Sequence, residues 1–265
     1  MLTGLGLWVW YWDDRFIEMA QRIGATYLLI KAADGLTPWA QWSQAAPVCR
    51  SAGILPIPWS YNYGDAREPD VLRNAAPDSN ILVVDPEVEY EGLPLAQQLQ
   101  FAQGLQALRV QGLTIGAACF ARPEGHQGYH YPELGASIDF WLPMVAWPYW
   151  NPPDVTYWLD FWDSFHLGKT IPWLPTYSDD AGTLIDPNTF LQSIRIAFGR
   201  YGAVTIWAAH TIHDEQVAIL ETAKQDWLGL PPLMAQSSSA PLILEGLMLV
   251  TSGLIIYRLS KGGAL

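Results

Sequence analysis

The sequence contains few charged residues, and few of these are basic. Asp, Glu, Lys and Arg make up 15% of the 265 residues, with 14 Lys and Arg against 26 Asp and Glu and a net charge of −12. An ordinary soluble protein has about 25% charged residues. Nucleic-acid binding requires a stripe of basic side chains that displaces counterions from phosphates, so this composition predicts no nucleic-acid partner.

Cysteine, metal-binding patterns and a signal peptide are scarce or missing too. Cys49 and Cys119 are the only cysteines and fall in no zinc-site spacing. His210 and His213 form an HxxH pair without a third ligand at regular spacing, so we expect no metal and no cofactor. The first residues lack the basic and long apolar regions of a signal peptide and predict a strand instead.

Apolar residues, in contrast, make up half of the chain, and there are 14 tryptophans. Short apolar runs alternate with segments of helical periodicity. We predict strands at 6–11, 27–32, 54–63, 81–87, 113–120, 140–150, 170–178 and 203–209. We predict helices at 13–24, 38–53, 66–76, 94–112, 154–165, 187–202 and 214–225, with Pro47 breaking or kinking the second.

This order predicts an α/β fold, a (β/α)8 TIM barrel over residues 1–229. The strands are nearly continuous apolar runs, as in parallel strands that are buried on both faces. The loop at 121–137 has no clear helix, so a doubly wound open sheet stays as the alternative.

The end of the chain has a different character. Residues 230–240 are a linker rich in Pro and Ser, and 241–260 form a hydrophobic segment of roughly 30 Å if helical. We expect either a transmembrane helix or an oligomerising helix. The expected partners are therefore a membrane or further copies of the chain in a homo-oligomer. The expected location is membrane-associated, at the cell surface or in a virion.

Four carboxylates are concentrated in the stretch "VVDPEVEYEG", at the end of the fourth predicted strand. Barrel enzymes place their active sites at the carboxyl ends of the strands. Asp85 and Glu87 are two residues apart, so on an extended strand they share a face at roughly 6.6 Å. One carboxyl can then act as a general acid while the other stabilises a positively charged centre.

These carboxylates also have a simpler interpretation, since acidic residues after a strand often cap the next helix or face water. We take Asp85 and Glu87 as catalytic, Glu89 as a reserve candidate if Pro86 shifts the register, and Glu91 as solvated.

Aromatic side chains follow many of the predicted strands and suit the flat faces of sugar rings, although several of them equally fit a plug in the barrel top. The predicted substrate-binding residues are Trp10, Lys31, Asp34, Trp59, Asn62, Tyr63, Trp147, Tyr149 and Trp207. Lys31 has three possible partners, Asp85, the substrate or a structural ion pair, and Asn62 and Tyr63 are candidates for sugar hydroxyls or an N-acetyl group.

Three stretches carry a family resemblance: "GLGLWVWYWDDRFIEMAQRIGATYLLIKAADG", "ILPIPWSYNYG" and "ILVVDPEVEYEG". Together they resemble the glycoside hydrolase family 25 barrels, the muramidase-type lysozymes, and more closely their bacterial or phage relatives with "KAADG" after the second strand. The resemblance implies catalysis by Asp85 and Glu87, and hydrolysis of a β-1,4 bond in peptidoglycan or a related N-acetylated polysaccharide.

The chain departs from that family in its first strand, "LWVW", which lacks the usual Asp, and in its last, "TIWAAH". Two functions therefore stay open. The first is a glycoside hydrolase acting on cell-wall glycan. The alternative is a catalytically degenerate structural or carbohydrate-binding barrel in a surface or phage-tail assembly.

Overall fold

The computed structural model describes residues 2–146, 148, 153–178 and 182–228. It contains eight parallel strands and one short antiparallel addition. The strands are β1 (Gly4–Val9), β2 (Ala25–Asp34), β3 (Thr37–Pro38), β4 (Leu55–Asn62), β5 (Ile81–Pro86), β6 (Thr114–Phe120), β7 (Phe140–Met144), β8 (Trp173–Pro175) and β9 (Ala203–Trp207).

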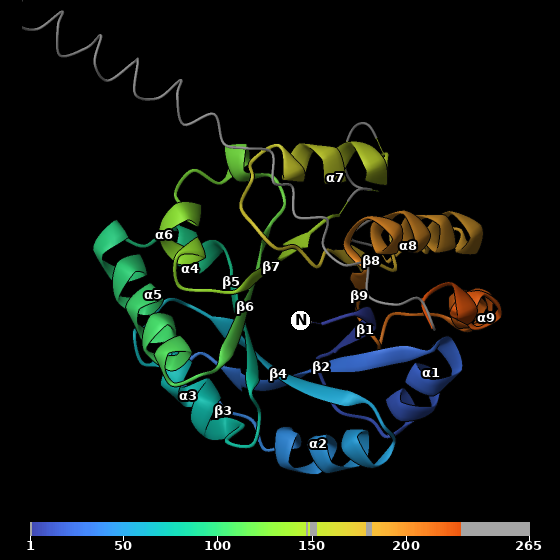
Figure 1. Cartoon of the computed structure of the whole chain (residues 1–265), viewed down its shortest axis with the longest axis horizontal. Helices are drawn as coiled ribbons and strands as arrows, with labels where there is room; N and C mark the ends of the chain where they lie inside the picture. Colours follow the sequence, from blue (N-terminus) through green and yellow to red (C-terminus); the bar gives the residue numbers. More distant parts are fainter. Residues whose placement is uncertain (1, 147, 149–152, 179–181, 229–265) are drawn as a thin grey trace, which may run out of the picture. The chain divides into compact units, whose positions relative to one another are not determined.

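The eight parallel strands close into a barrel, because β1 pairs with both β2 and β9. This pairing excludes the open sheet and confirms the predicted TIM barrel. Helices surround the ring of strands (Figure 1). They are α1 (Arg15–Ile23), α2 (Gln41–Ser51), α3 (Glu68–Ala75), α4 (Val88–Glu91), α5 (Leu95–Val110), α6 (Tyr131–Gly135), α7 (Val155–Asp163), α8 (Pro187–Tyr201) and α9 (Asp214–Ala223).

Several predicted boundaries differ from the structure. The strand expected at 140–150 ends at Met144, and the one expected at 170–178 is only the three residues of β8. Helix α2 is continuous from Gln41 to Ser51, with Pro47 inside it. The loop at 121–137, where no clear helix was expected, contains only a 3-10 turn and the five-residue α6.

The barrel has two hydrophobic layers, which explains why its strands are apolar on both faces. In β1, Leu5, Leu7 and Val9 belong to the layer between the strands and the helices. Trp8 points the other way and belongs to the cluster inside the barrel. This alternation follows from the two-residue period of a strand.

Glycines on two strands make room for large rings inside the barrel. A Cβ atom on Gly6 would lie 2.1 Å from the ring of Tyr27, and one on Gly116 would lie 2.4 Å from the ring of Phe140. Tyr27 donates from its hydroxyl to the carbonyl of Val204 at 3.2 Å. Side chains therefore fill the barrel interior.

The predicted membrane-associated or surface location is corrected by the structure. Within the described ranges, no helix is long and apolar enough to cross a bilayer. The helices there pack on the barrel, and α5, with 16 residues, is the longest of them. The predicted linker 230–240 and helix 241–260 lie outside the described residues.

Candidate active site at the carboxyl ends of the strands

Strand β5 delivers the two central carboxyl groups. Val83 points into the barrel, so Asp85, two residues later, points the same way, and it is only 4% exposed. The backbone N–H of Asp85 donates to Oδ1 of Asn62 at 3.0 Å, which joins the ends of β4 and β5. Glu87 follows the strand, at the residue before α4, and is half-buried.

Burial raises the pKa of both carboxyls. The pKa of Asp85 is well above its usual range because the group is buried and because Glu87 is close, although Lys31 opposes the shift. Burial, and then the charge of Glu89, raise the pKa of Glu87 from 4.5 to about 7. Oδ1 of Asp85 has no hydrogen-bond partner among the described residues. Both groups therefore favour the protonated form more than a free carboxyl does, and Glu87 exchanges its proton near neutral pH.

The other two carboxylates of the stretch lie on α4. Glu89 is exposed and accepts a hydrogen bond from the hydroxyl of Tyr61 at 2.7 Å. Glu91 was expected to be solvated, but it is half-buried and lies 2.8 Å from Nδ1 of His126. His126 stacks on Phe120 with ring centroids 3.7 Å apart. The four carboxylates thus have four different environments.

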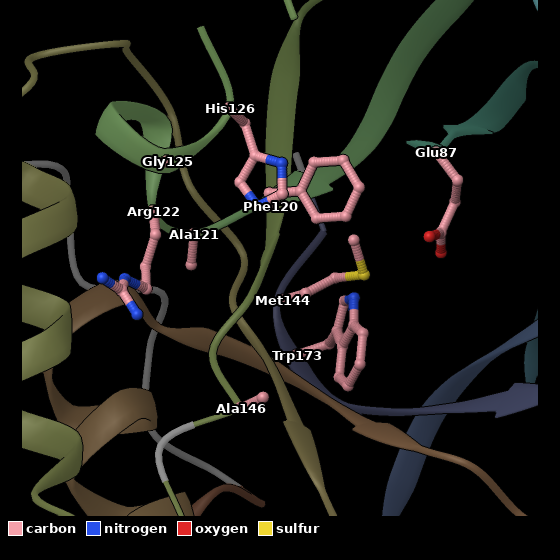
Figure 2. Close-up of a pocket in the computed structure, with 9 residues that line it drawn as sticks. All are labelled: Glu87, Phe120, Ala121, Arg122, Gly125, His126, Met144, Ala146 and Trp173. Carbon is pink, nitrogen blue, oxygen red and sulfur yellow. The ribbon is translucent and has the colours of Figure 1, made fainter. Parts of the chain in front are cut away.

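Glu87 lines a pocket on the β6–β8 side of the barrel mouth. The pocket has a volume of about 370 Å³. Figure 2 shows the carboxyl of Glu87 on one side, facing the side chains of Met144 and Trp173, with His126 against Phe120. One titrating carboxyl thus faces a largely apolar cavity, an arrangement that is common in small-molecule sites.

Tryptophans fill the space beneath this mouth. Trp8 and Trp59 are fully buried and meet edge to face at 5.2 Å, and both contact Trp207. Trp10 and Trp173 complete the group and, like Trp207, are half-buried. The sequence offered two roles for these aromatic side chains, sugar binding and a plug in the barrel top, and each role fits a different set. Trp8 and Trp59 are part of the plug. Trp10, Trp173 and Trp207 lie between the plug and the open mouth.

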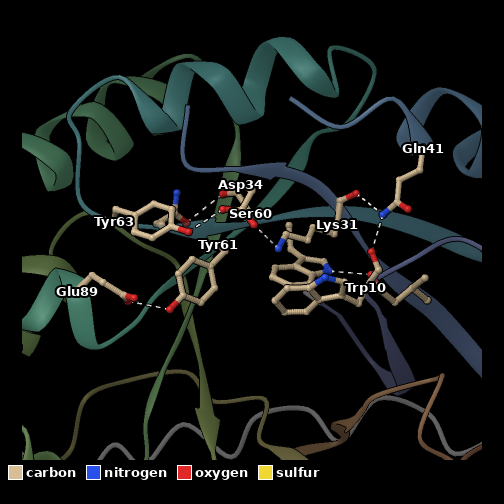
Figure 3. A network of polar contacts seen from close by, with 11 residues as sticks. Trp10, Lys31, Asp34, Gln41, Ser60, Tyr61, Tyr63 and Glu89 are labelled. Carbon is tan, nitrogen blue, oxygen red and sulfur yellow. Dashed lines mark hydrogen bonds and ion pairs between the residues drawn. The ribbon is translucent and has the colours of Figure 1, made fainter. Parts of the chain in front are cut away.

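Lys31 is a fully buried cation at the end of β2. Its Nζ lies 2.7 Å from Asp34, 3.5 Å above the ring of Trp10 and 4.6 Å from that of Trp39. Figure 3 shows this ammonium beside Asp34 and the Trp10 ring. Burial lowers its pKa, and the contact with Asp34 opposes the shift. Of the partners considered for Lys31, the structure realises the ion pair with Asp34.

Gln41, at the start of α2, supports this cluster and was missed by sequence reasoning. Its Nε2 donates to the carbonyls of Trp10 at 2.9 Å and Lys31 at 2.7 Å, while its Oε1 accepts from the N–H of Trp12 at 2.8 Å. One amide therefore joins the ends of β1 and β2. A Gln at a helix start carries no sequence signal for such a role.

Asn62 and Tyr63 have different surroundings. Asn62 is fully buried; its Oδ1 accepts from Ser60 and Asp85, and its Nδ2 donates to Glu68 at 3.2 Å. These contacts disfavour the predicted contact with a sugar. Tyr63 is 43% exposed and donates to Asp34 at 2.9 Å, so its ring is available to a ligand.

The remaining candidates from the sequence either lie outside the described residues or have a structural role. Trp147 and Tyr149 lie outside the described residues. His213 precedes α9 and takes part in its N-terminal capping box. Within residues 2–146, 148, 153–178 and 182–228, no group of three or more His, Cys, Asp or Glu side chains is arranged to hold a metal ion.

No protein-family model and no curated protein matches the chain in sequence. Solved structures do match its fold. A chitinase from Chromobacterium violaceum aligns with 87% of this chain and 100% of its own at 14% identity and a TM-score of 0.61. The spore cortex-lytic enzyme SleL of Bacillus megaterium aligns with 87% of this chain and 75% of its own, at 12% identity and 0.59.

A third match is the catalytic domain of a family GH18 chitinase from the fern Peteris ryukyuensis, with 84% of this chain and 98% of its own aligned, 10% identity and a TM-score of 0.58. At these identities the similarity is one of fold. The chain has a TIM barrel of the kind found in glycoside hydrolases, and these neighbours do not single out family 25.

Proposed function

We propose that the barrel is a glycoside hydrolase that cleaves β-1,4 bonds in a cell-wall glycan, peptidoglycan or a related N-acetylated polysaccharide. The observation that carries the proposal is Glu87, a carboxyl with a pKa of about 7 that lines an apolar pocket at the mouth. A general acid works best when its pKa lies near the working pH. The neighbours, which are chitinases and a cortex-lytic enzyme, support the choice of glycan substrates.

In this proposal Glu87 donates its proton to the bridging oxygen as the bond between that oxygen and the anomeric carbon breaks. Water then adds to the anomeric carbon, and the ionised Glu87 takes up the proton that this water loses. The positive charge that develops on the sugar ring requires an ionised group nearby. Asp85 is buried, and the raised pKa of its carboxyl disfavours the ionised form that would supply this charge. Glu89, exposed and accepting a hydrogen bond from the hydroxyl of Tyr61, is a further candidate for this group.

Asp85 then acts on Glu87. The two carboxyls repel each other when both are ionised, so the proton on one favours ionisation of the other. A proton on Asp85 would limit the negative charge that accumulates when Glu87 releases its own. The finer assignment to muramidase-type barrels rests on the sequence motifs and stays part of the proposal.

A second function, a carbohydrate-binding barrel without turnover, is favoured by one observation. Asp85, one of the two residues that the family resemblance makes catalytic, is buried with an unpartnered oxygen and does not line the pocket. Binding would then depend on the half-buried tryptophans and the pocket.

Release of oligosaccharides from chitin oligomers and from peptidoglycan decides between the two. The wild-type chain is compared with Glu87→Gln, Asp85→Asn and, as a matched control, Glu215→Gln on the exposed face of α9. Hydrolysis requires that wild type and the control release product and that Glu87→Gln loses at least about 100-fold of the rate, the size typical of a lost general acid. Binding with no release in any variant would establish the second function.

A further inference from the structure

A group of aromatic rings lies outside the pocket and takes no part in the proton transfer proposed for Glu87. Four aromatic residues, here called the aromatic shelf, lie at the end of β4 or just after β1, β3 and β4: Tyr11, Trp39, Tyr61 and Tyr63. Tyr11 is 65% exposed and stacks on Trp39 with centroids 5.5 Å apart and an interplanar angle of 23°. Tyr63 is 43% exposed and meets Tyr61 at 5.1 Å.

The two ring pairs belong to one surface. Nζ of Lys31 lies 4.6 Å from the ring centroid of Trp39 and 5.7 Å from that of Tyr61. Because one ring of each pair lies near the Lys31 ammonium, the Tyr11–Trp39 pair and the Tyr61–Tyr63 pair are neighbours. Tyr11 and Tyr63 contribute little to the core because they are exposed. A group of exposed aromatic rings on one surface is typical of a binding site.

The β2–β3 hairpin builds much of this shelf. Ala33 pairs with Pro38 and Asp34 with Thr37, an excursion that the eight-strand barrel does not require. Its turn residue Gly35 has a φ of +51°, and a Cβ there would lie 2.8 Å from the Tyr63 ring. The hairpin thus packs directly against one ring and ends at Trp39, the next residue in the chain.

Carboxylates hold the edges of the shelf. The hydroxyl of Tyr63 donates to Asp34 at 2.9 Å, and that of Tyr61 donates to Glu89 at 2.7 Å (Figure 3). The rings are therefore fixed in orientation, and carboxylate oxygens remain beside them as acceptors for hydroxyl groups. Flat apolar faces bordered by acceptors match a sugar ring, which has an apolar face and a hydroxylated edge. The same carboxylates disfavour a polyanionic chain.

The shelf and the pocket lie on opposite sides of Glu87. The pocket is lined from β6, β7 and β8, whereas the shelf comes from β1, β3 and β4. Glu87 follows β5, which lies between β4 and β6 in the barrel. At about 370 Å³ the pocket is near the lower end of the usual size for small-molecule sites, so it is too small for a polymer segment.

We infer that the shelf is a second glycan-binding subsite, which takes further sugar units of an uncharged hexosamine polymer whose other end occupies the pocket. This inference rests on the proposed glycan specificity, and it adds that the site takes a strand of several sugars across the barrel mouth with Glu87 between its two halves.

The test uses the full chain with Glu87→Gln, so that ligands are not consumed. Calorimetric titrations with the di- and hexasaccharides of N-acetylglucosamine give the dissociation constants, first for this parent and then with Tyr11→Ala or Tyr63→Ala added. Tyr157→Ala on α7, another exposed tyrosine at 47%, is the matched control. Melting temperatures verify that each variant folds.

The hexasaccharide should bind the parent more tightly than the disaccharide. Each shelf variant should weaken hexasaccharide binding by about 3- to 10-fold, the loss typical of one aromatic contact, and leave disaccharide binding unchanged. Tyr157→Ala should change neither constant.

Equal affinity for the two lengths, or hexasaccharide binding unaffected by both shelf variants, overturns the shelf while leaving the proposed hydrolysis intact. Length-dependent binding to the parent together with no product release by the wild type supports the shelf and rejects hydrolysis. No binding of either sugar rejects both.

Discussion

The raised pKa of Glu87 has a consequence for folding that needs no substrate to measure. The group titrates at about 7 when folded and near 4.5 when unfolded. Between these values the folded state holds the proton and the unfolded state does not, so the free energy of unfolding falls as the pH rises. A difference of about 2.5 pH units corresponds to about 3 kcal/mol, fully present below pH 4.5 and lost as the pH passes 7.

Glu87→Gln removes this titration and keeps the shape of the side chain. We expect the variant to gain stability relative to the wild type as the pH rises from 4 to 8, by about 3 kcal/mol in total and mostly between 4.5 and 7. Urea unfolding followed by tryptophan fluorescence at each pH gives the difference, and Glu215→Gln, an exposed residue of α9, is the control. A difference between Glu87→Gln and wild type that does not vary with pH would refute the assignment of Glu87 as a buried, titrating acid.

Three further predictions concern activity and packing. If Glu87 is the general acid, release of reducing ends should fall about tenfold per pH unit above 7, because its protonated fraction does so. Gly6→Ala should lower the free energy of unfolding by about 1–3 kcal/mol, since its new Cβ would be 2.1 Å from a ring atom of Tyr27. Gly199→Ala in α8 should raise the free energy of unfolding by about 0.5–1 kcal/mol, because its new Cβ would have no heavy atom within 4 Å. Urea unfolding of both variants checks the two signs. Lys31→Met should stay within about 1 kcal/mol of wild type, because Met fills the space of the buried stem and the remaining Asp34 side chain is 29% exposed and still accepts from Tyr63. Lys31→Ala should lose about 2–5 kcal/mol because it leaves a cavity, and equal losses measured by thermal unfolding would contradict this.

The barrel could be predicted because its determinants are local. A parallel strand covered on both faces has to be apolar throughout, and β2 and β5 show this in sequence as "YLLIKA" and "ILVV". The two-residue period also predicted that Asp85 and Glu87 would lie toward the mouth, although it could not separate a buried carboxyl from one that lines a pocket. That distinction depends on side chains of other strands.

The remaining parts of the site depend on contacts between distant residues. Gln41 reaches Trp10 across 31 positions, and His126 reaches Glu91 across 35. Neither pair has a spacing or motif that a single sequence reveals. The boundaries of β7 and β8 were overestimated for a related reason, since apolar aromatic segments continue past the last ladder hydrogen bonds.

The filled barrel interior limits how ligands can enter and leave the site. Tyr27 and Phe140 occupy the space left by two glycines, and Trp8 and Trp59 are closed off from solvent above them. Among the described residues, these side chains fill the barrel axis, so a ligand bound at the mouth leaves on the side from which it enters. For an enzyme that cleaves a polymer, both fragments of the cut sugar chain would then compete with the next chain for the mouth. The loops around the mouth would govern turnover, and residues at the base of the barrel would tolerate sequence change.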